Sequence, residues 1–328
     1  MKQIRFEQQY RPGWESLEQQ LTQLEAVRVS RRKALPLDHF VGDYRQLCHQ
    51  LALARERSYS LELQQYLNNL VLRAHRQLYR YNPPLAERIG QFFAHGFPQA
   101  VRRQWQWHLI SALSFVLSIA LAWWLVQQQP DMVYTVLDES SLADIEMMYQ
   151  PEGSDVNVHE GRTGEDDVVM FGFYIKNNIG IAFRTFAGGL LLGVGAIVVM
   201  LFNGSFFGAI AAHLINVGGD QPFFTFVIAH GAPELTAIVL AGGAGLRLGW
   251  AIIAPGAYTR LDALRLAARD ALPTMYGVFT LLLLAAFIEA FWSPREFEPM
   301  VKYAVGAACW GLLYLYLIFG GRDGSRKR

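Results

Sequence analysis

The sequence predicts an all-α protein, with a polytopic helical membrane domain of about six spans preceded by a small helical bundle. Three observations support this fold class. Residues 1–103 contain no long apolar run and carry 16 Lys and Arg against 9 Asp and Glu. In the same part, apolar residues recur at spacings of three and four, as on one face of a helix. From Trp107 onward long apolar stretches dominate, and about 20 apolar residues suffice to cross a bilayer.

The N-terminal part, 1–103, is expected to form a cytoplasmic helical domain. The apolar spacing predicts helices over 12–28, 37–56 and 60–81, and a short helix over 85–96 leads toward the membrane. Pro83-Pro84 ends the third helix, because proline lacks a backbone donor and restricts the residue before it. Three or four helices of this length indicate an antiparallel bundle. The two cysteines, Cys48 and Cys309, are too few and too far apart for a disulfide framework.

The rest of the chain is expected to hold the membrane spans. A first span within 104–127 is flanked by tryptophans, which are typical of the membrane interface. The domain 168–320 is less regular, and interrupted or short helices are expected over 170–250. There 170–183 resembles an interfacial helix, and 204–217 is predicted as a short crossing that raises the count to six. The other predicted spans are 107–126, 185–202, 223–246, 272–292 and 300–319.

The charge distribution predicts the orientation. The loop 128–167 contains eleven acidic residues and one basic residue. Because Lys and Arg are retained on the cytoplasmic side, this loop is expected in the periplasm. The basic tail, 321–328, and the N-terminus are then cytoplasmic, which fits a bacterial inner-membrane protein. A short helix is expected over 139–149, with the remainder of the loop mobile.

The segment His230-Gly231-Ala232-Pro233-Glu234 is the main candidate site. Pro233 inside an apolar segment predicts a helix break and restart, which would place Glu234 near a helix N-terminus. Ionisable residues at membrane depth are candidates for function. Three interpretations stay open: a structural lock, a substrate or proton path on a broken helix, and a metal or hydrolytic site. The last has least support, since His230 and Glu234 supply only two ligands. We therefore predict no metal, no cofactor and no catalytic residue.

Other polar and small residues complete the candidates. The polar side chains of Asn177, Asn178, Asn203 and Arg184 flank a predicted span and are assigned with His230 and Glu234 to a functional polar core. Glu289 is expected to be solvated near a span end. Three GxxxG pairs are predicted to support helix packing within the chain or a homodimer interface: Gly189 and Gly193, Gly204 and Gly208, Gly245 and Gly249.

Two segments carry a family resemblance. NNIGIAFRTFAGGLLLGVGAIVVMLFNGSFFGA (177–209) and HGAPELTAIVLAGGAGLRLGW (230–250) resemble the stage II sporulation protein M family of integral membrane proteins. YLNNLVLRAHRQLY (66–79) is similar to the cytoplasmic extension of members from non-sporulating bacteria. The positions that match the family's pattern are Asn177, Asn178, Asn203, Gly204, His230, Gly231 and Glu234.

The resemblance implies a non-enzymatic scaffold in an envelope-associated complex. It implies protein partners such as a MoxR-type AAA+ ATPase, von Willebrand factor A domain proteins or cell-wall enzymes. The basic domain and the acidic loop would be the docking surfaces. A transporter or channel-like protein that uses the broken helix at His230–Glu234 is the alternative, followed by an intramembrane enzyme. The other expected partner is the lipid bilayer, and no motif indicates nucleic acid.

Overall fold

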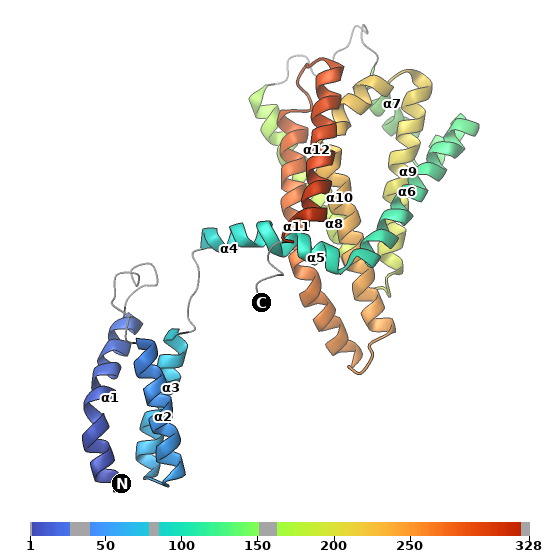
Figure 1. The fold of residues 1–328 in the computed structure, drawn as a ribbon. Helices are drawn as coiled ribbons and strands as arrows, with labels where there is room; N and C mark the ends of the chain where they lie inside the picture. Colours follow the sequence, from blue (N-terminus) through green and yellow to red (C-terminus); the bar gives the residue numbers. More distant parts are fainter. Residues whose placement is uncertain (1, 27–39, 79–84, 151–162, 323–328) are drawn as a thin grey trace. The chain divides into compact units, whose positions relative to one another are not determined.

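The computed structural model describes residues 2–26, 40–78, 85–150 and 163–322 (Figure 1). Within these ranges the ordered elements are all helices, so the predicted all-α class is confirmed. The chain divides into two compact units, Met1–Ile89 and Gly90–Arg328. The sequence placed this boundary at residue 103. The structure places it earlier because the helices after residue 89 pack against the apolar helices of the second unit.

The first unit contains three long helices, α1 (Gln3–Ala26), α2 (Phe40–Glu56) and α3 (Leu61–Leu78). Their apolar faces enclose one core that includes Leu21, Leu47 and Leu67, each at most 1% exposed. The helix α1 begins earlier than the predicted residue 12, because Phe6 also joins this core at 1% exposure. Pro12 lies inside α1 and is exposed. The unit therefore has a hydrophobic core of its own, as a small helical bundle requires.

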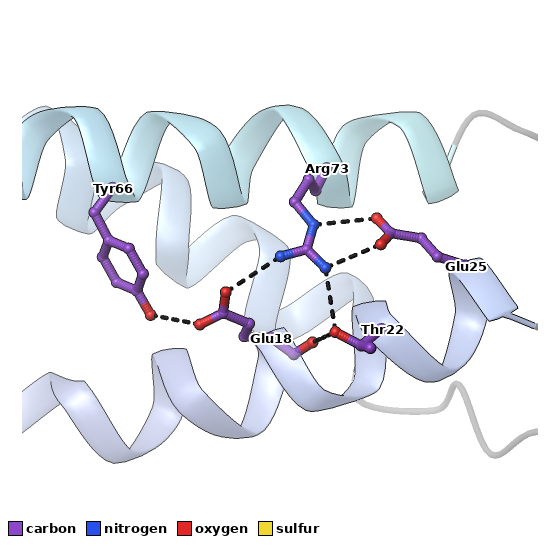
Figure 2. Close-up of polar contacts among 5 residues, drawn as sticks. All are labelled: Glu18, Thr22, Glu25, Tyr66 and Arg73. Atoms are coloured by element: carbon purple, nitrogen blue, oxygen red, sulfur yellow. Dashed lines mark hydrogen bonds and ion pairs between the residues drawn. The ribbon is translucent and has the colours of Figure 1, made fainter.

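A polar network fastens α1 to α3 along one side of this unit (Figure 2). The Arg73 guanidinium contacts Glu18 at 3.2 Å and Glu25 at 3.0 Å. The Tyr66 hydroxyl donates to Glu18 at 3.0 Å. Burial and this hydrogen bond to a carboxylate raise the pKa of Tyr66 to about 12. The network lies at the rim of the core, where Arg73 is the shared donor for two acidic side chains.

The second unit begins with short helices and continues with long apolar ones (Figure 1). In the described part of the chain, five helices are long and apolar enough to cross a membrane, namely α6, α9, α10, α11 and α12. The protein is therefore a membrane protein. The helix α4 (Leu85–Gln91) crosses the boundary between the two units. The elements after it are η2 (Phe92–Gly96), α5 (Phe97–Arg103), α6 (Trp105–Gln128), η3 (Pro130–Thr135), α7 (Glu139–Met148), α8 (Gly164–Gly188), α9 (Val194–Val217), α10 (Asp220–Ile253), α11 (Arg260–Phe291) and α12 (Pro299–Phe319).

The predicted spans at 185–202 and 204–217 are wrong. The chain turns between α8 and α9, so 185–202 belongs to two helices, and 204–217 is the second half of α9. Leu192 and Gly193 take positive φ angles of 56° and 84° at this turn. Glycine adopts such angles without steric cost. The predicted interfacial segment 170–183 is part of the 25-residue helix α8, which packs against α10 and α11.

The predicted helix break at His230–Pro233 is also wrong. The helix α10 runs without interruption for 34 residues, and Pro233 lies inside it. Proline removes one backbone donor, but packing neighbours allow it in membrane helices. Pro233 is buried among such neighbours. The helix α11 begins at Arg260, well before the predicted span 272–292.

The described part of the acidic loop is folded. The helix predicted over 139–149 is confirmed as α7. The expectation that the remaining loop is mobile is wrong for η3. Val133 and Leu142 are 1% and 2% exposed and pack in one cluster with Leu214 and Phe223 of α9 and α10. In Figure 1, α7 lies at the same end of this unit as the connection between α11 and α12. Residues 151–162 of the predicted loop lie outside the described residues.

The glycines of the three GxxxG pairs lie at close approaches between helices of the same chain. Gly189 and Gly193 at the α8–α9 turn face Gly245 and Gly249 of α10. Gly204 and Gly208 of α9 face the backbone of Phe115 and Ile119 in α6. A Cβ atom at Gly204 would lie 2.7 Å from the Phe115 carbonyl oxygen. Small residues at these positions let the helix backbones approach.

Candidate functional site

Three ionisable side chains meet inside the membrane unit. His230 and Glu234 are one turn apart on α10, and Glu289 is near the end of α11. One ligand atom from each of the three lies within 4.8 Å of the others. Residues four apart share a helix face, so α10 presents the first two together toward α11. These three residues form what we call the polar cluster.

A hydrogen bond at one ring nitrogen holds the His230 side chain in place. The imidazole Nδ1 forms a hydrogen bond of 3.0 Å with the Ser293 hydroxyl, just after α11. This contact turns Nε2 toward Glu289, whose Oε1 lies 4.0 Å away. The Phe226 ring packs edge-on against the imidazole, with 5.3 Å between the ring centroids. The ring is 4% exposed, so its orientation is set by protein contacts.

Glu289 is held from the opposite side by α8. Asn178 Nδ2 donates to Glu289 Oε2 at 3.5 Å, and Asn177 Nδ2 donates to Asn178 Oδ1 at 3.0 Å. Asn178 is 2% exposed. The Glu289 side chain is 13% exposed, so the expectation that it is solvated is wrong. The helix α8 therefore supports a cluster whose own members lie on α10 and α11.

Glu234 occupies a different position from the expected one. Because α10 is continuous, this carboxylate lies in mid-helix and receives no help from a helix N-terminus. It is partly buried, and no described residue forms a hydrogen bond or ion pair with it. His230 and Glu289 each place a ligand atom within 4.8 Å of it. Two carboxylates in a poorly solvated site repel each other unless a cation or a proton intervenes.

Tyr149, directly after α7, lies close to this cluster. Its ring contacts Phe226 at 6.0 Å and Phe223 at 5.2 Å, and Phe226 in turn contacts His230. Burial raises the pKa of Tyr149, with smaller contributions from Tyr174, Glu289 and Glu234. The end of α7 is thus in electrostatic reach of the two carboxylates.

Two predicted members of the polar core lie elsewhere. Asn203 donates to the Val199 carbonyl oxygen at 2.7 Å within its own helix. Arg184 is exposed on α8. Conversely, sequence reasoning missed Glu289 as a partner and did not consider Ser293 or Tyr149. The spacing of four between Glu289 and Ser293 was a usable signal, since it places both on one side of the α11 end.

The arrangement can bind a cation or share a proton. An imidazole nitrogen and two carboxylate oxygens are common metal ligands. The same groups also pass protons in membrane proteins. His230 and Glu234 alone supply only two ligands, and the structure adds Glu289 as a third candidate ligand.

Comparison with known protein families agrees with this architecture. The family model of stage II sporulation protein M matches residues 111–294, which include the polar cluster. A domain of unknown function, DUF8413, matches residues 4–80, which cover the first unit. No curated protein and no solved structure matches the chain. The family match spans more than half of the 328 residues, so the chain belongs to the stage II sporulation protein M family.

Proposed function

We propose that this protein is a non-enzymatic membrane anchor that presents its first unit to partner proteins. The observation that carries the proposal is the difference between the surfaces of the two units. The first unit has its own core and exposes charged side chains, among them Arg5, Arg45 and Arg76. The second unit exposes large apolar side chains along helices long enough to cross a bilayer. One unit therefore suits water and the other suits lipid.

The proposed orientation follows from an alternation of helices. If α8 crosses beside the five apolar helices, the second unit has six crossings, and both chain ends face the same side. The connection between α10 and α11 then lies on that side, next to Arg260, Arg265 and Arg269. Lys and Arg favour the cytoplasm. We therefore propose an inner-membrane protein with cytoplasmic termini and with η3 and α7 in the periplasm.

The proposed partners are proteins with acidic surfaces on the cytoplasmic side. Residues 1–103 carry a net charge of +7, which favours such partners. A MoxR-type AAA+ ATPase and von Willebrand factor A domain proteins are the partner classes that the family resemblance brought forward. Cell-wall enzymes would meet the periplasmic face, where α7 and the acidic loop lie in this orientation.

Crosslinking in native membranes followed by affinity capture tests the anchor function. The full chain is compared with a variant that carries Arg45→Glu and Arg76→Glu, two exposed positions of the first unit. We expect a defined set of proteins with the wild type and a loss of at least tenfold with the variant, at equal membrane abundance. Capture of an identical set by both forms would contradict docking through this basic surface.

A second candidate function, movement of cations or protons, is favoured by the polar cluster alone. Three ionisable side chains in the membrane unit are costly unless they serve a purpose. The transport interpretation of the sequence required a broken helix at His230–Glu234, but α10 is continuous there. In reconstituted vesicles, Glu234→Gln should abolish a cation or proton flux if this function exists. The anchor function predicts that the same variant leaves partner capture unchanged.

A further inference from the structure

We propose that His230, Glu234 and Glu289 bind one divalent transition-metal ion, with Zn²⁺ as the representative ion. Ligand atoms of the three side chains lie within 4.8 Å of one another. In a zinc site with bonds of about 2.0–2.2 Å, neighbouring ligand atoms lie about 3.4 Å apart. Metal binding in this way requires the two glutamate side chains to rotate so that these distances shorten. This proposal is independent of the anchor function.

The charges of the three ligands match a divalent cation. Two carboxylates and a neutral imidazole carry a charge of −2, so one divalent ion makes the site neutral. A neutral site avoids the large cost of isolated charge in a low-dielectric environment. No lysine or arginine among the described residues forms an ion pair with Glu234 or Glu289.

The ligand types favour a transition metal over magnesium or calcium. Mg²⁺ and Ca²⁺ prefer sites made of oxygen atoms only. Imidazole nitrogen suits zinc and the neighbouring transition metals, and one imidazole with two carboxylates leaves a coordination position for water. Glu234 and Glu289 are half-buried, so the structure does not enclose the site completely.

The hydrogen bonds that hold the proposed ligands resemble those around a metal centre. A metal-binding histidine ordinarily donates its other ring N–H to an oxygen atom. Ser293 Oγ stands 3.0 Å from His230 Nδ1 and fills that position. Asn178 donates to Glu289 Oε2, which leaves Oε1 toward His230 Nε2. Lys302 Nζ donates to the Ser293 carbonyl oxygen at 3.0 Å and fixes the backbone behind the hydroxyl. These contacts orient His230 and Glu289 before any ion binds.

The same unit contains a control pair that lacks the third ligand. His213 Nε2 lies 2.6 Å from Glu146 Oε1, between α9 and α7. This pair is a histidine next to one carboxylate, of which the Glu146 side chain is 44% exposed. The proposal predicts that it binds zinc much more weakly, because two ligands do not make a zinc site.

The test measures zinc binding to the full chain in lipid nanodiscs. After treatment with a chelator, the protein is titrated with Zn²⁺ alone, and bound zinc is quantified by mass spectrometry. We expect one zinc ion per chain for the wild type. Glu289→Gln and Glu234→Gln should lower the zinc affinity at least tenfold. Ser293→Ala should lower it about 10-fold, the lower end of the range for residues that hydrogen-bond a metal ligand. Glu146→Gln should leave it unchanged.

X-ray absorption at the zinc edge of the wild type keeps the test valid where a variant fails to fold. The expected spectrum shows nitrogen and oxygen ligands only, with one imidazole. The proposal is overturned if the wild type binds no zinc, if the spectrum shows sulfur or several imidazoles, or if Glu146→Gln lowers the affinity as much as Glu289→Gln.

Discussion

Two buried histidines of the membrane unit lie in contrasting surroundings. His230 of α10 is 4% exposed, and a serine hydroxyl and two carboxylates surround it. His108 of α6 is 6% exposed, and neither of its ring nitrogens has a hydrogen-bond partner among the described residues. It packs against Gly243, where a Cβ atom would lie 2.8 Å from the His108 backbone.

The contrast extends to the neighbouring serines. Ser293 and Ser111 are both 0% exposed. Ser293 pairs with His230, whereas the Ser111 hydroxyl has no partner in the described part of the chain and faces Gly242. A buried histidine therefore does not make a site. The convergence of polar groups from separate helices does, and the region around His108 is instead a close contact between α6 and α10.

The largest effect is expected at that close contact. Gly243→Ala places a methyl group against the α6 backbone, which cannot yield as a side chain can. Overpacking of this kind costs about 3 kcal/mol at the upper end of its usual range. At Gly231 an added Cβ meets only the Val227 side chain, at 3.3 Å. Thermal unfolding in detergent should show a strongly lowered Tm for Gly243→Ala and a nearly unchanged Tm for Gly231→Ala. An equal change in Tm for the two substitutions would contradict the close packing of α6 on α10.

Replacing each histidine by leucine should separate the two regions next. His230→Leu leaves Ser293 and Glu289 without their partner and should cost about 2 kcal/mol, since buried polar groups then lose their polar contacts. His108→Leu removes two unpaired nitrogens and should leave stability unchanged or higher. Chemical unfolding of both variants measures the difference. A greater loss of stability for His108→Leu than for His230→Leu would contradict the description of His230 as the hydrogen-bonded histidine and His108 as the unpaired one.

The serines provide a smaller version of the same comparison. Ser293→Ala removes one hydrogen bond to a buried imidazole and should cost about 1 kcal/mol. Ser111→Ala removes an unpaired hydroxyl and should be neutral. Thermal unfolding of the two variants under identical conditions checks this order. Equal losses would show that the Ser293–His230 contact contributes nothing specific.

The smallest effect concerns the start of α7. Hydrogen bonds from Ser140 and Ser141 lower the pKa of Asp138 to about 2. A carboxyl with a depressed pKa stabilises the folded state above its ordinary pKa near 3.9, and that contribution is lost as pH falls toward 2. The protection factors of the α7 amides, which compare the exchange rate with the intrinsic rate at each pH, should therefore fall below about pH 4 in the wild type. In Asp138→Ala these protection factors should be lower already at pH 7, and identical profiles would refute the cap.

Sequence patterns predicted the membrane class and most spans because long apolar runs are a local signal. The same signal failed between α8 and α9, where Gly188 to Gly193 form a turn inside an apolar run. A turn cannot be recognised from hydropathy when the helices on both sides of it face lipid or protein. Pro233 was taken as a break, but buried packing keeps α10 continuous through it.

The site was predicted only where its residues are neighbours in one helix. His230 and Glu234 are four apart, so their proximity follows from helical spacing. Glu289 and Ser293 come from α11 and the residues after it, and only the packing of α10 on α11 brings them near. Asn203 and Arg184 matched in residue type but face other directions. Residue type thus identified candidates, and tertiary packing selected among them.

The most direct test of the contrast is the shift in Tm caused by zinc, measured side by side for wild type, His108→Leu and His230→Leu. A ligand that binds the folded state at about 100 times its Kd stabilises it by about 2.7 kcal/mol. The account predicts a zinc-induced rise in Tm for the wild type and for His108→Leu, and none for His230→Leu. A rise retained in His230→Leu, or lost in His108→Leu, would contradict it.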